Sequence, residues 1–73
     1  MNTYAYGDRT PSLGAHVFIA PGARIVGDVQ LGDEVNVWFN AVIRGDMAPV
    51  TIGAGTNIQD GCVLHVDDNY PLR

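Results

Sequence analysis

The feature that most constrains this 73-residue chain is a repeat of six residues. Large aliphatic side chains recur every six positions, and after three extra residues the same rhythm resumes. The aliphatic positions are Leu13, Ile19, Ile25, Leu31, Val37, Ile43, Ile52, Ile58 and Leu64. A period of six matches neither the turn of an α-helix, about 3.6 residues, nor a long alternating strand, but it fits short strands separated by turns. The repeat therefore predicts an all-β fold, a parallel β-helix of hexapeptide repeats.

Smaller side chains stand two positions before most of these large ones. They are Val17, Ala23, Val29, Val35, Ala41, Val50, Thr56 and Cys62. Alternate residues of a strand point to the same side, so both sets are expected to face inward. Each repeat then contributes one large and one smaller core residue. The single cysteine, Cys62, is accordingly expected to be a reduced core thiol.

Three hexads make one triangular coil, which divides the chain into about three coils. Residues 19–36 form one coil, residues 37–57 a second that is widened by three residues, and residues from 58 onward a third. The insertion falls within residues 47–51, directly after Asp46, and is expected to project as a loop. Residues 1–12 are expected to form a lead-in that caps the first coil. The predicted domain of β-helix coils is then residues 13–73.

The register of the coils brings two charged residues together. Positions one coil apart are separated by three hexads, and across the insertion by three hexads plus the extra residues. Arg44 and His65 are separated by this longer interval, and each directly follows a core residue. They are therefore predicted to stack on neighbouring strands, about 4.8 Å apart.

Charge and hydropathy exclude several classes of partner. The net charge is −4 and the chain has no lysine, which argues against binding to nucleic acid or to an anionic membrane, because both need basic clusters. No apolar run is long enough to span a bilayer, and residues 1–10 do not form a basic and then apolar leader. We therefore expect no nucleic-acid partner, no membrane, and a cytoplasmic location.

Three short segments contain most of the polar residues that have no evident structural role, and these segments resemble the γ-class carbonic anhydrase family. They are Val42-Ile43-Arg44-Gly45-Asp46, then Asn57-Ile58-Gln59-Asp60-Gly61, and Leu64-His65. The resemblance covers about residues 13–70 and implies a left-handed β-helix. The general rule for parallel crossovers favours the right hand, so the left hand is implied by the resemblance alone.

The resemblance also implies an activity, a metal and an assembly. The family catalyses the reversible hydration of carbon dioxide, as a homotrimer with metal sites between subunits. His65 matches the first metal-binding histidine of the family. The metal would be zinc, iron or cobalt, and it would activate a water molecule for attack on carbon dioxide. No organic cofactor is implied.

Five further residues match family positions around that site. Gln59 and Asn57 match the residues that orient the metal-activated water or the bicarbonate, and we assign them to catalysis. Arg44, Asp46 and Asp60 match residues that form ion pairs at the subunit interface beside the metal. A merely structural ion-pair cluster of the same three residues is the alternative interpretation.

The chain departs from the family pattern in two places. Met47 stands where archaeal members carry a glutamate that is thought to shuttle protons. The sequence stops at Arg73, where the next coil would begin, so the other metal-binding histidines and the C-terminal helix are absent from it. We expect a fragment that is inactive alone, because it offers one ligand where catalytic zinc normally takes three.

Other functions remain open for a hexapeptide-repeat chain. One is a non-catalytic or assembly member of the same family, in which the metal site is structural or lost. Another is an acyltransferase or acyl-coenzyme A thioesterase of the same fold. Trp38 and Phe39 are expected on an outward face, where they either pack a subunit interface, which we favour, or cover a strand.

Overall fold

The computed structural model of the protein describes residues 2–65, and within them all regular structure is β-strand. The strands are β1 (Thr3–Tyr4), β2 (Ser12–Leu13), β3 (Phe18–Ile19), β4 (Arg24–Leu31), β5 (Asn36–Val37), β6 (Val42–Ile52), β7 (Asn57–Ile58) and β8 (Val63–His65). No helix in this part of the chain could cross a membrane. The predicted all-β class is confirmed. Residues 66–73, the end of the predicted third coil, lie outside the described residues.

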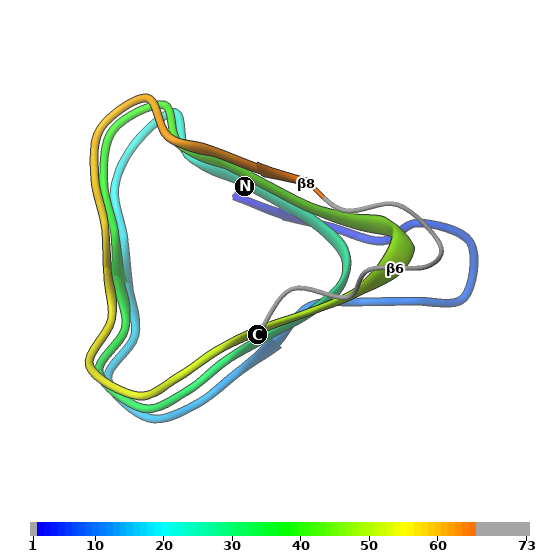
Figure 1. The fold of residues 1–73 in the computed structure, drawn as a ribbon, viewed down its shortest axis with the longest axis horizontal. Helices are drawn as coiled ribbons and strands as arrows, with labels where there is room; N and C mark the ends of the chain where they lie inside the picture. Colours follow the sequence, from blue (N-terminus) through cyan, green and yellow to red (C-terminus); the bar gives the residue numbers. More distant parts are fainter. Residues whose placement is uncertain (1, 66–73) are drawn as a thin grey trace.

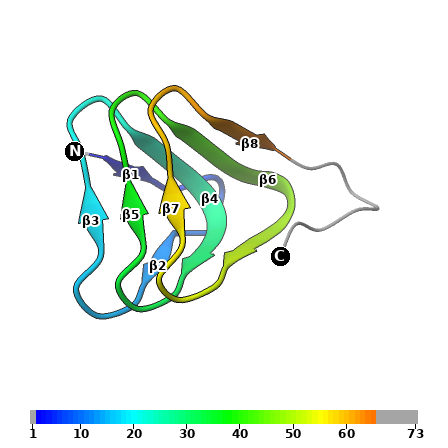
Figure 2. The ribbon, with the colours of Figure 1, turned by 60° about the vertical axis from the view of Figure 1, so that its left-hand side comes forward.

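The strands wind into a triangular coil (Figure 1). One sheet has the order β1-β4-β6-β8, with β2 also paired to β4, and the second sheet has the order β3-β5-β7. All strand pairs are parallel. Figure 2 shows β3, β5 and β7 stacked on one face of the triangle, while β4 and β6 bend around a corner and so contribute to the other two faces.

The register between coils confirms the predicted coil lengths. Ile19 pairs with Val37, its counterpart three hexads later. Val37 in turn pairs with Ile58, its counterpart three hexads later once the extra residues are counted. A longer second coil is what the insertion requires. The hexads are therefore the repeating unit of the solenoid, as the periodicity indicates.

The core lies along the axis of the coil and is made by the two predicted sets of inward residues. Buried side chains that pack together include Ala23, Ile25, Val29, Leu31, Val35, Val37, Ala41, Ile43, Val50, Ile52 and Ile58. Cys62 is a free thiol, half-buried against this cluster, in line with its predicted core position.

Two predicted core residues are exposed, and both predictions were wrong. Leu13 is 44% exposed, because β2 lies at the end of the stack and pairs with β4 alone. Thr56 is exposed because its hydroxyl instead donates a hydrogen bond of 2.7 Å to the Gly53 carbonyl. A threonine can close a local turn in this way, and that competes with an inward orientation.

The three extra residues do not form the projecting loop that we expected. Gly27 pairs with Gly45 and Val29 pairs with Val50, so residues 46–49 lie opposite Asp28 alone within the continuous strand β6. Ala48, inside this stretch, is buried. The insertion is therefore a β-bulge, which keeps the ladder intact on both sides and increases the local bend.

The N-terminal residues join the solenoid instead of standing apart from it. β1 pairs in parallel with residues Ile25 and Val26 of β4. The Asn2 side-chain amide donates to the carbonyl oxygens of Ala20 (3.3 Å) and Ala23 (2.8 Å), which ties the start of the chain to the first corner. The division into a cap at residues 1–12 and coils from 13 onward stays a prediction.

Two corners of the triangle use left-handed backbone at the same position of every coil. One column contains His16 (φ 57°), Glu34 (φ 60°) and Gly55 (φ 76°). The other contains Gly22, Asn40 and Gly61, also at positive φ. Residues with a Cβ are strained in this conformation, by about 1–2 kcal/mol, so the non-glycine members weaken their corners.

Replacing Glu34 by glycine is therefore expected to raise the free energy of unfolding by about 0.5–1 kcal/mol, since the relief of strain exceeds the extra entropy of an unfolded glycine. The Glu34 side chain is exposed, and the hydrogen bond of its backbone N–H to the Ala15 carbonyl (2.8 Å) is kept in the variant. Urea unfolding of Glu34→Gly beside Glu34→Ala checks this. Equal stabilisation by alanine would contradict the explanation, because alanine keeps the strain.

Candidate functional site

The candidate site begins with the stacked pair predicted from the register. Val42, Ile43 and Arg44 of β6 pair with Val63, Leu64 and His65 of β8. Ile43 is fully buried, so the side chains on either side of it point outward. The structure thus places Arg44 and His65 next to each other on the outer face, as expected.

Asp46 completes a three-residue cluster with this pair. Its Oδ1 lies 2.9 Å from His65 Nε2, and its Oδ2 lies 3.3 Å from Arg44 Nη2. Arg44 Nη2 also lies 3.1 Å from His65 Nε2. If His65 Nε2 carries a proton, it donates a hydrogen bond to Asp46; if it carries none, it accepts a hydrogen bond from Arg44. The ionised carboxylate favours the first arrangement, a charge-assisted hydrogen bond.

Asp46 is the electrostatic centre of this cluster. Burial alone would raise its pKa, but the hydrogen bond with His65 and the positive charge of Arg44 outweigh burial and leave the pKa below its usual value. Its side chain is 17% exposed, whereas those of Arg44 and His65 are 45% and 37% exposed. An anchored carboxylate therefore holds two side chains that remain open to a ligand or to another subunit.

Gly45 allows this geometry. It is buried and pairs with Gly27, and a Cβ at Gly45 would lie 2.4 Å from the Asp28 carbonyl oxygen. Only a glycine lets the strands approach here, where the bulge begins. The sequence offered a signal for this role, because Gly27-Asp28 precedes Gly45-Asp46 by one coil.

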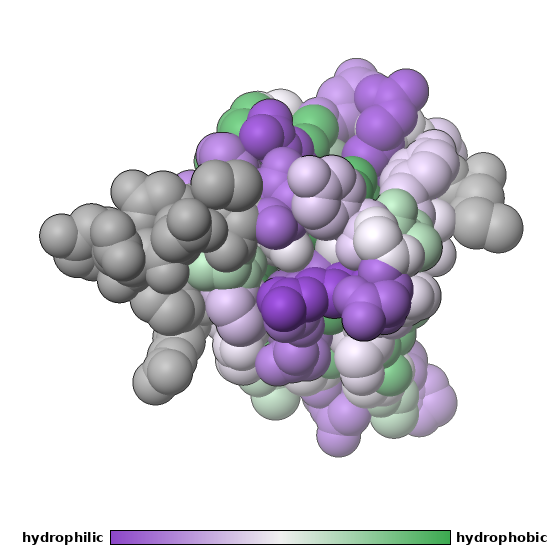
Figure 3. All heavy atoms as spheres, turned by 90° about the vertical axis from the view of Figure 1, so that its right-hand side faces the viewer, coloured by the Kyte–Doolittle hydropathy of each residue, from purple (hydrophilic) through white to green (hydrophobic). Residues whose placement is uncertain are grey.

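A second polar network at the same corner was not predicted. Arg9 Nη1 lies 3.4 Å from Asp28 Oδ2, and Gln30 Nε2 donates to Asp28 Oδ1 at 2.9 Å. Thr51 Oγ1 in turn donates to Gln30 Oε1 at 3.2 Å. Figure 3, which faces the corner of β4 and β6, shows hydrophilic side chains gathered at the centre of this face.

The other predicted site residues lie on a different face. Asn57 belongs to β7 and pairs with Asn36, while Gln59 and Asp60 follow it into the next turn. All three predicted site residues are exposed, and within residues 2–65 no hydrogen bond or ion pair joins them to Arg44, Asp46 or His65. One chain thus assembles Arg44, Asp46 and His65, and leaves Asn57, Gln59 and Asp60 apart.

The donors of the cluster fit part of a metal site. His65 supplies an imidazole, and Asp46 accepts a hydrogen bond from one of its ring nitrogens, the arrangement in which a carboxylate orients a ligating histidine. Residues 2–65 contain no group of three or more His, Cys, Asp or Glu side chains that could hold an ion by themselves. Further ligands would have to come from outside this part of the chain.

Comparison with known proteins agrees with these features. The bacterial transferase hexapeptide (six repeats) family matches residues 10–45. The chain is 51% identical over 69 residues to a carbonic anhydrase of Geobacillus kaustophilus, and the aligned residues cover 94% of this chain and 38% of that protein. It is 54% identical over 59 residues to a probable carbonic anhydrase of Methanocaldococcus jannaschii, covering 81% of this chain and 37% of that protein.

A plant relative and a solved structure extend the comparison. Gamma carbonic anhydrase 2, mitochondrial, of Arabidopsis thaliana is 44% identical over 59 residues, 81% of this chain and 21% of that protein. A crystal structure titled as a putative acetyltransferase from Bacillus cereus superposes with a TM-score of 0.93 at 46% identity, over 96% of this chain and 41% of that one. The chain thus spans less than half the length of each of these proteins. It belongs to the γ-carbonic anhydrase-like family of hexapeptide-repeat proteins, and its coils form a left-handed parallel β-helix.

Proposed function

We propose that the complete protein is a metalloenzyme that catalyses the reversible hydration of carbon dioxide. The observation that carries the proposal is the cluster of His65, Asp46 and Arg44 on an open face, in a chain about half identical to proteins named carbonic anhydrases. A metal ion, when bound, supplies Lewis-acid activation of a water molecule. Zinc, iron and cobalt all suit an imidazole ligand.

Three residues of this chain would each have a separate role at the site. His65 provides one nitrogen ligand. Asp46 accepts the hydrogen bond of the ring and so sets its tautomer and orientation, and Arg44 holds Asp46 through its second carboxylate oxygen. The guanidinium also leaves a positive charge beside the site, which favours the approach of bicarbonate in the reverse reaction.

The separation of Gln59 and Asn57 from this cluster suggests how a homotrimer would complete the site. Both side chains are exposed on the face of β7, so we propose that they orient the water or the bicarbonate across a subunit boundary. Asp60 would make its interface ion pair in the same way. Phe18 and Phe39 are exposed, and both pack against the half-buried Trp38, with ring centroids 5.1 and 6.1 Å apart; this aromatic group is a suitable apolar contact for that assembly.

The net charge limits the classes of partner that we propose for the protein. A net charge of −4 opposes a nucleic-acid or anionic-membrane partner and leaves small molecules as the substrates. We propose a cytoplasmic location for this chain, while the relative from Arabidopsis thaliana carries a mitochondrial name.

The test is carbon dioxide hydration by the full-length protein loaded with zinc or iron. We expect His65→Ala to lose the protein-dependent rate and to bind less metal, because one of the ligands is gone. The matched control is His16→Asn, since His16 is exposed at φ 57°, where asparagine is tolerated. Full activity of His65→Ala would refute the metal assignment, and an inactive wild type with stoichiometric metal would favour the non-catalytic alternative.

Acyl transfer is the second candidate, favoured by the structural neighbour titled as a putative acetyltransferase. An acyltransferase or acyl-coenzyme A thioesterase would act on a coenzyme A thioester without needing the His65 metal. Release of free coenzyme A from acetyl-coenzyme A, measured with water alone and with an added amine or alcohol as the acetyl acceptor, in wild type and His65→Ala, separates the two functions. Turnover that is equal in both proteins would favour this second candidate.

A further inference from the structure

The polar network of Arg9, Asp28, Gln30 and Thr51 lies beside the β-bulge, and none of its members belongs to the candidate metal site. Gln30 of β4 and Thr51 of β6 are partners in the strand register, and Thr51 Oγ1 donates a hydrogen bond of 3.2 Å to Gln30 Oε1. The same amide donates through its Nε2 to Asp28 Oδ1 at 2.9 Å. Gln30 therefore joins the strand that contains the bulge to the residue that lies opposite the bulge.

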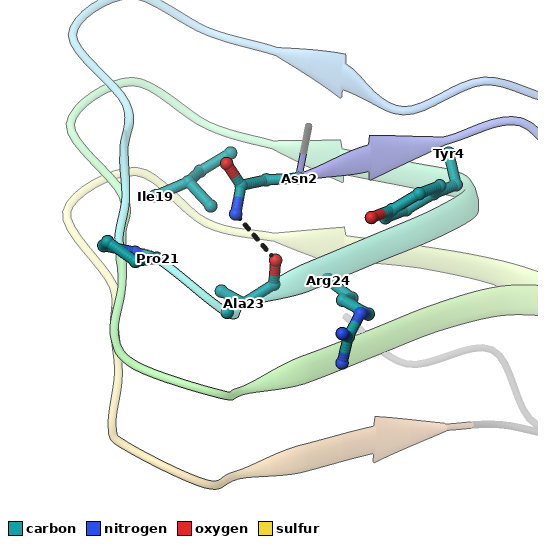
Figure 4. Close-up of a pocket in the computed structure, with 7 residues that line it drawn as sticks. Asn2, Tyr4, Ile19, Pro21, Ala23 and Arg24 are labelled. Atoms are coloured by element: carbon teal, nitrogen blue, oxygen red, sulfur yellow. Dashed lines mark hydrogen bonds between the residues drawn. The ribbon is translucent and has the colours of Figure 1, made fainter.

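Asp28 is also held from a second direction, by the N-terminal segment. Arg9 Nη1 lies 3.4 Å from Asp28 Oδ2, so each carboxylate oxygen has its own partner. The segment that carries Arg9 is itself tied to the start of β4, because the Asn2 side-chain amide donates to the Ala23 carbonyl at 2.8 Å (Figure 4). Partners on both oxygens limit the rotation of this carboxylate and of the backbone that carries it.

The backbone of Asp28 in turn lies directly against Gly45. A Cβ at Gly45 would meet the Asp28 carbonyl carbon at 2.7 Å, so nothing separates the two backbones. Gly45 stands between Arg44 and Asp46 and is the last paired residue before the bulge. A shift of Asp28 would turn the peptide from which Asp46 extends, and would change the 2.9 Å contact of Asp46 Oδ1 with His65 Nε2. Supporting residues have to hold such a contact within about 0.5 Å.

We propose that Gln30 and Thr51 are positioning residues for the pair of Asp46 and His65. They hold the β4 backbone against the start of the bulge, and so fix the direction in which Asp46 reaches the imidazole. Both act at a distance, because their hydrogen bonds end at Asp28 and at each other. The inference deepens the proposed function and rests on it for the role of His65 as a metal ligand. Partners that orient a ligating histidine also set the affinity for the metal.

The test is Thr51→Val in the full-length protein. Valine keeps the branched shape and strand preference of threonine but cannot donate to Gln30, and Thr51 is exposed, so the urea midpoint should not change. In the metal-free protein, we expect the nitrogen and proton NMR signals of the His65 ring to shift toward those of an unrestrained imidazole. The affinity for zinc should fall by about threefold to tenfold, at or below the loss of ~10–100-fold that follows removal of a direct partner of a ligand.

Two further variants make the comparison specific. Thr51→Ser keeps the hydroxyl donor and should behave as the wild type in both measurements. Ser12→Ala is the matched control, because Ser12 pairs with Gln30 from the other neighbouring strand, is exposed, and makes no side-chain hydrogen bond within residues 2–65. It should leave the His65 signals and the zinc affinity unchanged.

Unchanged His65 signals and zinc affinity in Thr51→Val would overturn the proposal, and so would an equal loss in Ser12→Ala or in Thr51→Ser. A loss that comes only with a lower urea midpoint would assign a merely structural role and would also overturn it. Neither measurement uses carbon dioxide. Shifted His65 signals in a protein whose wild type does not hydrate carbon dioxide would therefore contradict the proposed function and still support the positioning role.

Discussion

Replacing Gly45 with alanine is expected to lower the free energy of unfolding by about 3 kcal/mol. The new Cβ would lie 2.4 Å from the carbonyl oxygen and 2.7 Å from the carbonyl carbon of Asp28. Both are backbone atoms of the neighbouring strand, so no side-chain rotation can relieve the contact. β4 and β6 would have to separate where the bulge begins, and this would also displace Arg44 and Asp46 on either side.

The matched control is Gly53→Ala. A Cβ there has Thr56 Oγ1, 4.0 Å away, as its nearest contact, so the free energy of unfolding should change by less than about 0.5 kcal/mol. Urea unfolding followed by circular dichroism measures both variants. If Gly45→Ala were as stable as Gly53→Ala, the two strands would not approach as closely as the structure shows.

Truncating Ile43 to alanine is expected to cost about 2–5 kcal/mol, the usual range for a large aliphatic side chain removed from a packed core. Ile43 is fully buried, and it lies between Ile25 on one neighbouring strand and Leu64 on the other. The coils on both sides would keep a cavity open, because each is held by its own ladder of hydrogen bonds.

Leu13→Ala tests the same repeat position at the end of the stack. Leu13 is 44% exposed, so its truncation should cost less than about 1 kcal/mol. Thermal and urea unfolding of the two variants compare a central with a terminal hexad. Equal losses would mean that Leu13 is covered in solution, for example by another subunit.

Much of the fold could be predicted from the sequence, because the hexad is a local pattern that repeats. The spacing of Ile25, Ile43 and Leu64 predicted both their inward direction and their pairing. The same spacing placed Arg44 beside His65. It could not show that Leu13 lacks a covering coil, because exposure at the end of a stack depends on what lies beyond it.

The candidate site was predicted in part. The contact between Arg44 and His65 follows from the register, but the position of Asp46 depends on how the three extra residues fold. A loop and a bulge have the same length in a sequence, and burial of Ala48 together with the close approach of Gly45 to Asp28 decides for the bulge.

The amino-acid sequence by itself determined the parallel β-helix, its coil lengths and the pairing of Arg44 with His65. These follow from a fixed rise of the strands and a regular alternation of side chains, which depend only on residue spacing. Only the tertiary structure decided that Asp46 joins that pair and that Gln59 and Asn57 lie on another face. The physical reason is that these features depend on packing at a bulge, at corners and at the end of the stack, where neighbours distant in the sequence determine which side chains meet.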